Sequence, residues 1–411
     1  MGAPSNLPSA AELAAEAKRR YDGSHGQSRA PLPTEIGAQA EFFFQHGELD
    51  TIYLRTLIDS HVFAGQPNAG HVAVADFLLT GAVQVAVSTN VDTMIETAGQ
   101  LLFGQIEVGI ERATVAALPA DVSPLLKVHG CWTIDRRNTV WAKGQLAADP
   151  VASRIAESEE WMSVRLLDKD LIIVGFFTDW DYLNGVLERT LGAVTPARVL
   201  VVNPDKGAQL AGKAPSLFAL GGRARVNFFH VRSFGDAFLD SLRLRFSTSF
   251  YRRAVLAGAQ AYEDVKGAPP DLAWAETSIG DSDTLWRIRR DLEGCAPNRP
   301  ALKRTPPEEP ALGLTILQLR AKGAVEDGSY WVIDGRRVRL LRTPNQMLHQ
   351  VQAAYARETP PVVAAEITVA VGAEAVSLPS HLVRGRSSPS IARGTIGKWL
   401  TRQDAVTELK L

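Results

Sequence analysis

The chain has 411 residues, 45% of them hydrophobic and 22% charged, and its formal net charge at pH 7 is −1. These values are ordinary for globular proteins, and the length favours two domains over one. The near-neutral charge gives no overall indication of binding to nucleic acid or to a membrane surface. The two cysteines, Cys131 and Cys295, are too few for a disulfide framework or a four-cysteine zinc site.

Neither a membrane span nor a secretory leader is predicted. The sequence has no apolar run of the roughly 18–20 residues that a bilayer requires, and its start lacks the basic-then-apolar order of a signal peptide. A cytoplasmic location is therefore expected. The basic residues near the C-terminus are expected to form a solvated face or a partner surface rather than a nucleic-acid site. They are Arg384, Arg386, Arg393, Lys398 and Arg402.

The N-terminal part of the chain is predicted to be mainly helical. Ser9 and Glu12 have the spacing of a capping box, which predicts a helix that begins beside Ser9. Residues 33–103 carry many apolar side chains at the three- and four-residue steps of amphipathic helices. His71 stands at the start of one of these helices, where we expect it to cap or pack rather than to bind a ligand.

Short apolar, β-branched runs then alternate with helical segments. This alternation predicts an α/β fold with a doubly wound, Rossmann-like parallel sheet. The strands at 83–88 and 125–128 are expected to be buried on both faces of that sheet. Residues 131–150 interrupt the pattern and are expected to form a polar hairpin. The predicted strands are VQVAVS at 83–88, IEVGI at 106–110, LLKV at 125–128, LIIVG at 171–175, RVLVV at 198–202 and RVNFFHV at 225–231.

The remaining chain is predicted to form a second domain. Residues 234–267 read as strongly helical, and a proline-rich stretch at 295–313 reads as a linker. Asp334-Gly335 between two apolar runs predicts a β-hairpin. The predicted organisation is therefore a first domain at 1–267, a helix and linker at 268–310, and an α+β accessory domain at 311–411 for assembly or partner binding.

Polar and small residues follow the predicted strands. The carboxyl ends of parallel strands are where ligands bind in open α/β sheets. The strand at 83–88 is followed by Thr89, Asn90 and Asp92, and the strand at 125–128 by His129 and Gly130. Similar positions at the next two strands hold Gly175, Thr178 and Asn203.

A strand ending in T-N-x-D, and a later strand ending in H-G, resemble the sirtuin-like NAD-dependent family. Two further pieces, DLIIVGFFTDWD and ARVLVVNPD, follow in the order typical of that family. The resemblance covers roughly residues 1–240, and the lack of cysteine pairs matches the zinc-free bacterial branch. It implies an NAD+ hydrolase (NADase) without zinc that releases nicotinamide and ADP-ribose in antiviral defence. It also implies a homo-oligomer or a defence partner, such as an ATPase or a short Argonaute.

The resemblance also assigns roles to individual residues. It gives Asn90 the fixing of the ribose and the attacking water, and it makes His129 the base near the ribose hydroxyls. It places Asp92 at the nicotinamide carboxamide. Replacing Asn90 or His129 by alanine is then expected to abolish turnover and to leave the fold nearly intact. The other residues that it assigns to dinucleotide binding are Thr89, Gly130, Gly175, Thr178 and Asn203.

Two alternatives remain open beside the hydrolase. One is an NAD-dependent protein deacylase, and the other is a catalytically inactive subunit that binds NAD or ADP-ribose. The family's first strand and its G-A-G-x-S loop have no counterpart before Ser9. We expect in-frame codons upstream of Met1 to encode them, and an in-frame stop within about ten codons would refute that expectation.

Overall fold

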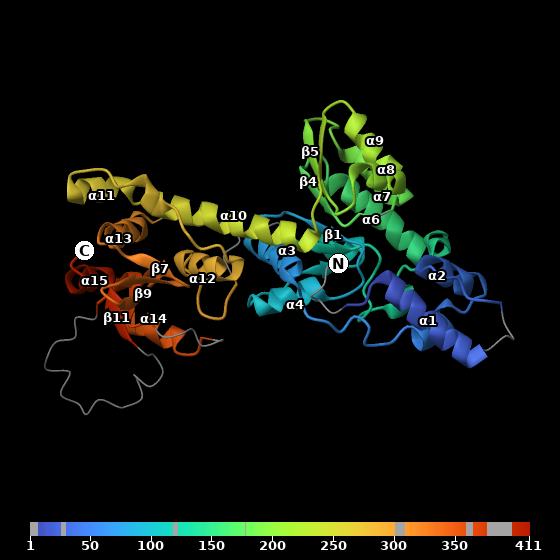
Figure 1. The fold of residues 1–411 in the computed structure, drawn as a ribbon, viewed down its shortest axis with the longest axis horizontal. Coiled ribbons are helices and arrows are strands. Elements are labelled where there is room, and N and C mark those ends of the chain that lie inside the picture. The colour runs from blue at the N-terminus through green and yellow to red at the C-terminus, as the bar shows by residue number, and fades with distance from the viewer. Residues whose placement is uncertain are drawn as a thin grey trace. The chain divides into compact units, whose positions relative to one another are not determined.

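The computed structural model describes residues 7–25, 30–117, 122–176, 178–300, 309–358, 365–375 and 397–411. The chain forms two compact units, and the boundary between them falls inside helix α10 (Gly235–Leu256). The first unit comprises Met1–Leu101 and Gln105–Asp240. The second comprises Leu102–Gly104 and Ser241–Leu411 (Figure 1).

The first unit begins with helices, and its first helix has the predicted capping box. The Ser9 amide donates to Glu12 Oε2 at 2.7 Å, and the Glu12 amide donates to Ser9 Oγ at 3.2 Å. His71 caps its helix as expected, because its Nδ1 accepts from the Asn68 amide while Asn68 Oδ1 accepts from the His71 amide. The elements of this part are α1 (Ala10–His25), α2 (Ile36–Gln45), the π-helical η2 (Leu49–Leu57) and α3 (Ala69–Thr80).

The strands of the first unit pair in parallel, as predicted, and form two three-stranded sheets. One sheet has the order β1-β3-β2 and the other the order β4-β5-β6, so β1 and β4 both lie at sheet edges. The strands are β1 (Ala86–Ser88), β2 (Val108–Gly109), β3 (Leu125–Lys127), β4 (Leu171–Val174), β5 (Ala197–Val202) and β6 (Val226–Val231).

Burial on both faces is predicted for the strands at 83–88 and 125–128, and this prediction is correct for β3 and wrong for β1. Every residue of β3 is buried, whereas the residues of β1 are only partly buried. In β4, Ile172 and Val174 are 46% and 38% exposed. The physical reason is their position, because an edge strand has a neighbouring strand on one side only.

Helices pack against the two sheets of the first unit and form apolar cores with them. The helix after β3 and the helix after β4 share one apolar cluster with β3, which includes Leu126, Met162 and Val186. The helices after β4 and β5 pack on β5 around Val199 and Val201. The helices are α4 (Met94–Leu101), α5 (Arg112–Ala116), α6 (Val151–Arg165), α7 (Asp181–Thr190), α8 (Gly207–Lys213), α9 (Pro215–Ala219) and the 3-10 turn η5 (Leu220–Gly222).

The hairpin predicted at 131–150 is wrong, because this segment forms the 3-10 turns η3 (Arg136–Asn138) and η4 (Lys143–Ala147). The Gln145 side chain supplies the hydrogen bonds that a partner strand would otherwise make. Its Oε1 accepts from the amides of Trp141 and Ala142 at 2.7 and 2.9 Å, and its Nε2 donates to the Thr139 carbonyl at 3.0 Å. A single side chain thus forms hydrogen bonds with three backbone groups. The alternation of apolar and polar residues along the sequence does not show that a side chain takes the place of a partner strand.

The second unit combines helices with a five-stranded mixed sheet of order β11-β10-β9-β8-β7. The predicted hairpin is confirmed, since β8 and β9 pair antiparallel on either side of Asp334 and Gly335, whose φ angles are 48° and 71°. Its helices are α10, α11 (Ala259–Lys266), η6 (Leu272–Ala275), α12 (Ser282–Leu292), α13 (Pro310–Ala321), α14 (Leu348–Tyr355) and α15 (Arg402–Glu408). Its strands are β7 (Val325–Asp327), β8 (Tyr330–Ile333), β9 (Arg336–Met347), β10 (Ile367–Glu374) and β11 (Lys398–Thr401).

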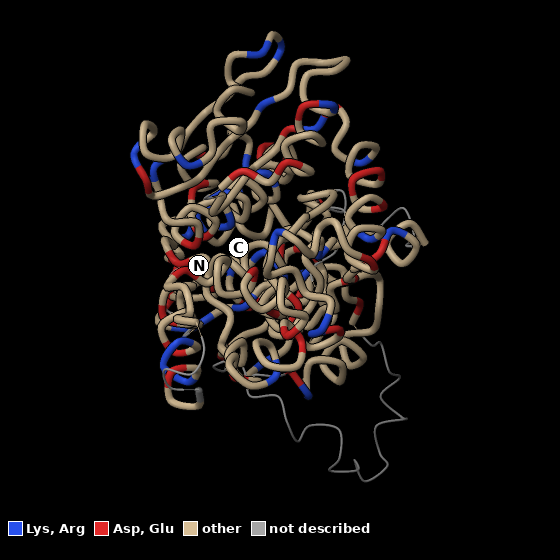
Figure 2. The backbone as a smooth tube through the Cα atoms, turned by 90° about the vertical axis from the view of Figure 1, so that its right-hand side faces the viewer, with Lys and Arg blue, Asp and Glu red and all other residues tan. Residues whose placement is uncertain are grey.

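Basic and acidic residues are interspersed along the backbone, among uncharged residues (Figure 2). Of the predicted basic cluster, Arg384, Arg386 and Arg393 lie outside the described residues. Lys398 forms an ion pair with Glu408 at 2.6 Å, and Arg402 donates to Thr315 Oγ1 at 3.1 Å. Among the described residues, no helix has both the length and the apolar character needed to cross a bilayer.

Candidate functional site

The loops that follow β1 and β3 lie side by side, because the two strands pair in parallel with Ser88 opposite Lys127. Beyond the strands, the Val128 amide donates to the Ser88 carbonyl at 3.0 Å, and the Trp132 amide donates to the Val91 carbonyl at 2.8 Å. These two bonds hold the T-N-x-D segment along the H-G segment. The fold therefore brings the two predicted motifs together at the carboxyl end of one sheet.

His129 lies at the centre of this arrangement and is only 4% exposed. Its Nε2 is 2.8 Å from the hydroxyl of Tyr182, and the ring of Trp180 packs edge-on at 4.6 Å between centroids. Burial, together with the nearby Arg154 cation, lowers the pKa of His129 to about 4, although a hydrogen bond to the backbone of Thr89 opposes the shift. The imidazole is therefore neutral near pH 7 and has one basic lone pair.

Asn90 and Asp92 stand on the same loop in different surroundings. Asn90 is exposed, and its backbone amide donates to Ser88 Oγ at 3.1 Å, which fixes the turn after β1. Asp92 is 5% exposed, and its Oδ1 accepts from the Met94 amide at the start of α4. Its Oδ2 is buried without a hydrogen-bond partner among the described residues. A buried, unpaired carboxylate oxygen is costly, so this atom can accept a hydrogen bond from a ligand.

Lys127 supports this loop from inside the domain, although sequence patterns gave no sign of it. The side chain is 1% exposed, and its ammonium donates to the Asp92 carbonyl and to Glu96 Oε1. Cys131 Sγ lies 3.6 Å from the same nitrogen. The cation thus ties β3 to the loop after β1 and to α4. Among the described residues, no group of three or more histidine, cysteine or acidic side chains is placed to hold a metal ion.

Four further residues complete the predicted set. Gly130 is buried in the left-handed region at φ +84°, where an added Cβ would lie 3.3 Å from Arg154 Nη1. Gly175 follows β4 at φ +71°, and its amide donates to the Val202 carbonyl. Thr178 is exposed on the segment that leads to α7. Asn203 is fully buried, and its side chain joins the Phe176 carbonyl to the Asp205 amide at 3.0 and 2.7 Å.

The predicted residues therefore form two groups. Thr89, Asn90, Asp92, His129 and Gly130 gather at the end of the sheet that contains β1 and β3. Gly175 and Asn203 gather at the end of the sheet that contains β4 and β5. The segment from β4 to α7 links the two groups, because it carries both Thr178 and the Tyr182 hydroxyl that meets His129.

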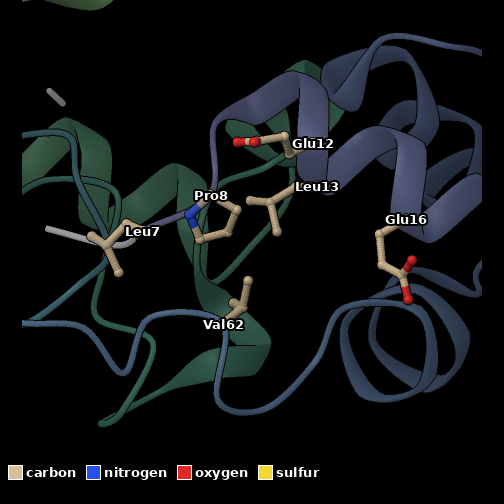
Figure 3. A pocket seen from close by; sticks show the side chains of 6 residues that line it. All are labelled: Leu7, Pro8, Glu12, Leu13, Glu16 and Val62. Carbon is tan, nitrogen blue, oxygen red and sulfur yellow. The ribbon is translucent and has the colours of Figure 1, made fainter. Parts of the chain in front are cut away.

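The hollow drawn in Figure 3 lies apart from both groups. It has a volume of about 480 Å³ and opens at the start of α1. Its lining residues are Leu7, Pro8, Glu12, Leu13, Glu16 and Val62. None of these is a predicted site residue, and they offer two carboxylates and otherwise apolar side chains, so this hollow has no part in the chemistry considered below.

The low pKa of His129 predicts a pH dependence of stability. The unfolded chain has an ordinary histidine pKa of about 6.5, so between pH 6.5 and about 4 it binds a proton that the folded protein does not bind. The contribution of the neutral His129 to the free energy of unfolding is fully present above the unfolded pKa. About 3 kcal/mol of that free energy is lost as the pH falls to about 4. Burial lowers the pKa of His71 as well, so the test compares two proteins. The free energy of unfolding of His129→Gln is expected to fall less steeply than that of the unsubstituted protein, and equal slopes would contradict the prediction.

No family model matches the chain, and no curated protein matches it. The geometry of the site and the motifs themselves therefore carry the functional conclusion.

Proposed function

We propose that the protein is a sirtuin-like NAD+ hydrolase that releases nicotinamide and ADP-ribose, and that it acts in antiviral defence by depleting NAD. One observation carries the proposal: the T-N-x-D loop and the H-G loop lie side by side at the ends of paired parallel strands. Such strand ends are the usual ligand sites of α/β sheets. The defence role follows from the resemblance to the zinc-free bacterial branch alone.

The surroundings of the residues suit their proposed roles. The buried Oδ2 of Asp92 would accept a hydrogen bond from the carboxamide of nicotinamide. Asn90, which is exposed on the same loop, would hold the ribose and the incoming water. The bond that breaks joins the ribose C1′ to a cationic nitrogen, so nicotinamide leaves as a neutral molecule and needs no acid. What remains is positioning and proton removal, which the neutral imidazole of His129 can supply.

Among the described residues, β1 and β4 each pair with a strand on one side only, which supports the finer fold proposal that both sheets belong to one doubly wound sheet. A further parallel strand between these two edge strands would join them and would pair with their backbone groups. In the sirtuin-like family that position belongs to the strand that leads into the G-A-G-x-S loop. Such a loop would provide backbone amides for the dinucleotide phosphates.

The proposal is tested by product analysis. The purified protein is incubated with NAD, with and without an acetylated peptide, and the products are separated by chromatography. Equal amounts of nicotinamide and ADP-ribose without peptide would support the hydrolase. Nicotinamide together with O-acetyl-ADP-ribose, formed only with the peptide, would establish the deacylase instead. Binding of NAD by calorimetry without any product would favour the inactive subunit.

The second unit is proposed to control the activity through self-association or a defence partner, such as an ATPase or a short Argonaute. An unregulated NADase would harm its own cell, so a control surface is expected. Light scattering on the full chain at rising concentration, with turnover measured in the same samples, tests self-association. If the mass stays monomeric and turnover per chain stays constant, self-association does not control the activity.

A further inference from the structure

His129 has no nitrogen left for a direct contact with substrate. Its Nε2 is engaged by the Tyr182 hydroxyl at 2.8 Å, and its other contact is with the backbone of Thr89. A backbone carbonyl only accepts, so the tautomer that satisfies both contacts has its proton toward Thr89 and its lone pair on Nε2. Tyr182 is then the donor in the 2.8 Å hydrogen bond, and it covers the only basic atom of the ring.

Tyr182 is the more accessible member of this pair. His129 is almost fully buried under Trp180, whereas Tyr182 is only partly buried at the start of α7. Burial raises the pKa of the Tyr182 hydroxyl above its ordinary value, so the hydroxyl keeps its proton near pH 7. A phenol oxygen that donates one hydrogen bond still has lone pairs with which to accept another.

We propose that Tyr182 passes the proton between the substrate and His129, so that its hydroxyl, and not the imidazole, meets the ribose hydroxyl. This inference rests on the proposed NAD hydrolysis. The ribose O–H bond breaks as its proton moves to the Tyr182 oxygen, and the Tyr182 proton moves to Nε2, which leaves a ribose alkoxide and an imidazolium. Water adds to C1′ as nicotinamide departs, the alkoxide takes a proton from that water, and the imidazolium returns its proton to solvent through Tyr182. The overall change is NAD+ plus water to ADP-ribose, nicotinamide and one proton.

The charged groups around the pair limit how long the imidazolium persists. Arg154 on α6 faces both side chains, and its cation disfavours a protonated His129. Glu159, on the same helix, acts on Tyr182 and keeps its phenol protonated. The contacts from the other elements are uncharged, namely the Thr89 backbone after β1 and the ring of Trp180 before α7. A protonated His129 is therefore disfavoured, which favours return of its proton through Tyr182.

The test compares Tyr182→Phe with the matched control Tyr53→Phe. Tyr53 is a buried tyrosine of the same unit whose hydroxyl donates to Gln39 Oε1 at 3.1 Å, far from the motifs in sequence. Tyr182→Phe is expected to lower kcat roughly 100-fold with little change in KM, the lower end of the range that a positioned general base contributes. Tyr53→Phe is expected to lose thermal stability without losing turnover.

A second readout separates this inference from the proposed function. Removing the donor destabilises the neutral imidazole, so the pKa of His129 in Tyr182→Phe is expected to rise by about one unit, followed by NMR titration of the ring. The acid limb of kcat/KM is expected to shift upward by the same amount. An unchanged His129 pKa, or a variant that turns over as fast as the parent or faster, would overturn the relay. If the parent itself releases no nicotinamide, the proposed function fails, and the NMR titration still decides the hydrogen bond.

Discussion

Lys127→Met is expected to lower the free energy of unfolding by about 3–5 kcal/mol, because removing one member of a buried ion pair leaves its partner uncompensated. In the folded protein, Lys127 is 1% and Glu96 18% exposed, so water does not replace the lost ammonium easily. The Asp92 carbonyl also loses its donor. Methionine fills a similar volume, so the loss reflects charge and hydrogen bonding rather than a cavity.

The control for Lys127→Met is the double variant Lys127→Met/Glu96→Leu. Replacing both charges with apolar side chains removes the unpaired carboxylate, so the double variant is expected to be more stable than Lys127→Met alone. Urea denaturation of the three proteins at neutral pH measures the difference. A double variant no more stable than Lys127→Met would mean that the ion pair does not support the loop.

His129→Gln is expected to reduce turnover of NAD about 10²- to 10⁴-fold, the range that a positioned general base contributes. Glutamine can still accept a hydrogen bond from Tyr182, but it cannot take up a proton near neutral pH. The burial of His129 in the structure changes the expectation that replacing it by alanine leaves the fold nearly intact. His129 is buried and contacts Trp180 and Tyr182, so replacing it by alanine would create a cavity and leave polar groups unpaired.

The measurement for His129→Gln is steady-state release of nicotinamide alongside the unfolding free energy. Turnover within threefold of the parent, in a variant that remains folded, would mean that His129 supports the fold and has no role as a base.

Local sequence signals predicted the parts of the fold that local physics determines. The capping box at Ser9, the cap made by His71 and the turn at Asp334-Gly335 each depend on residues within a few positions of one another. The parallel strands followed from short β-branched runs. The same reasoning failed at residues 131–150, because the backbone groups there are satisfied by Gln145 and not by a strand partner.

The places of Tyr182 and Lys127 in the site could not be predicted from the sequence, because their contacts join segments that are distant along the chain. Tyr182 lies 53 positions after His129, inside a segment whose pattern indicates only a helix start. Lys127 stands within an apolar strand, and its carboxylate partner Glu96 is 31 positions away. Pairing across strands and helices brings these side chains together, and a single sequence contains no record of that pairing.

The central claim is that Asn90 and His129 form one NAD-cleaving site, and release of nicotinamide by the parent protein and by Asn90→Ala tests it most directly. Asn90 is exposed, so the substitution is expected to change the free energy of unfolding by less than about 0.5 kcal/mol. The account predicts steady release of nicotinamide by the parent and a loss of at least about 100-fold in a folded Asn90→Ala. Equal release by the two proteins would contradict it.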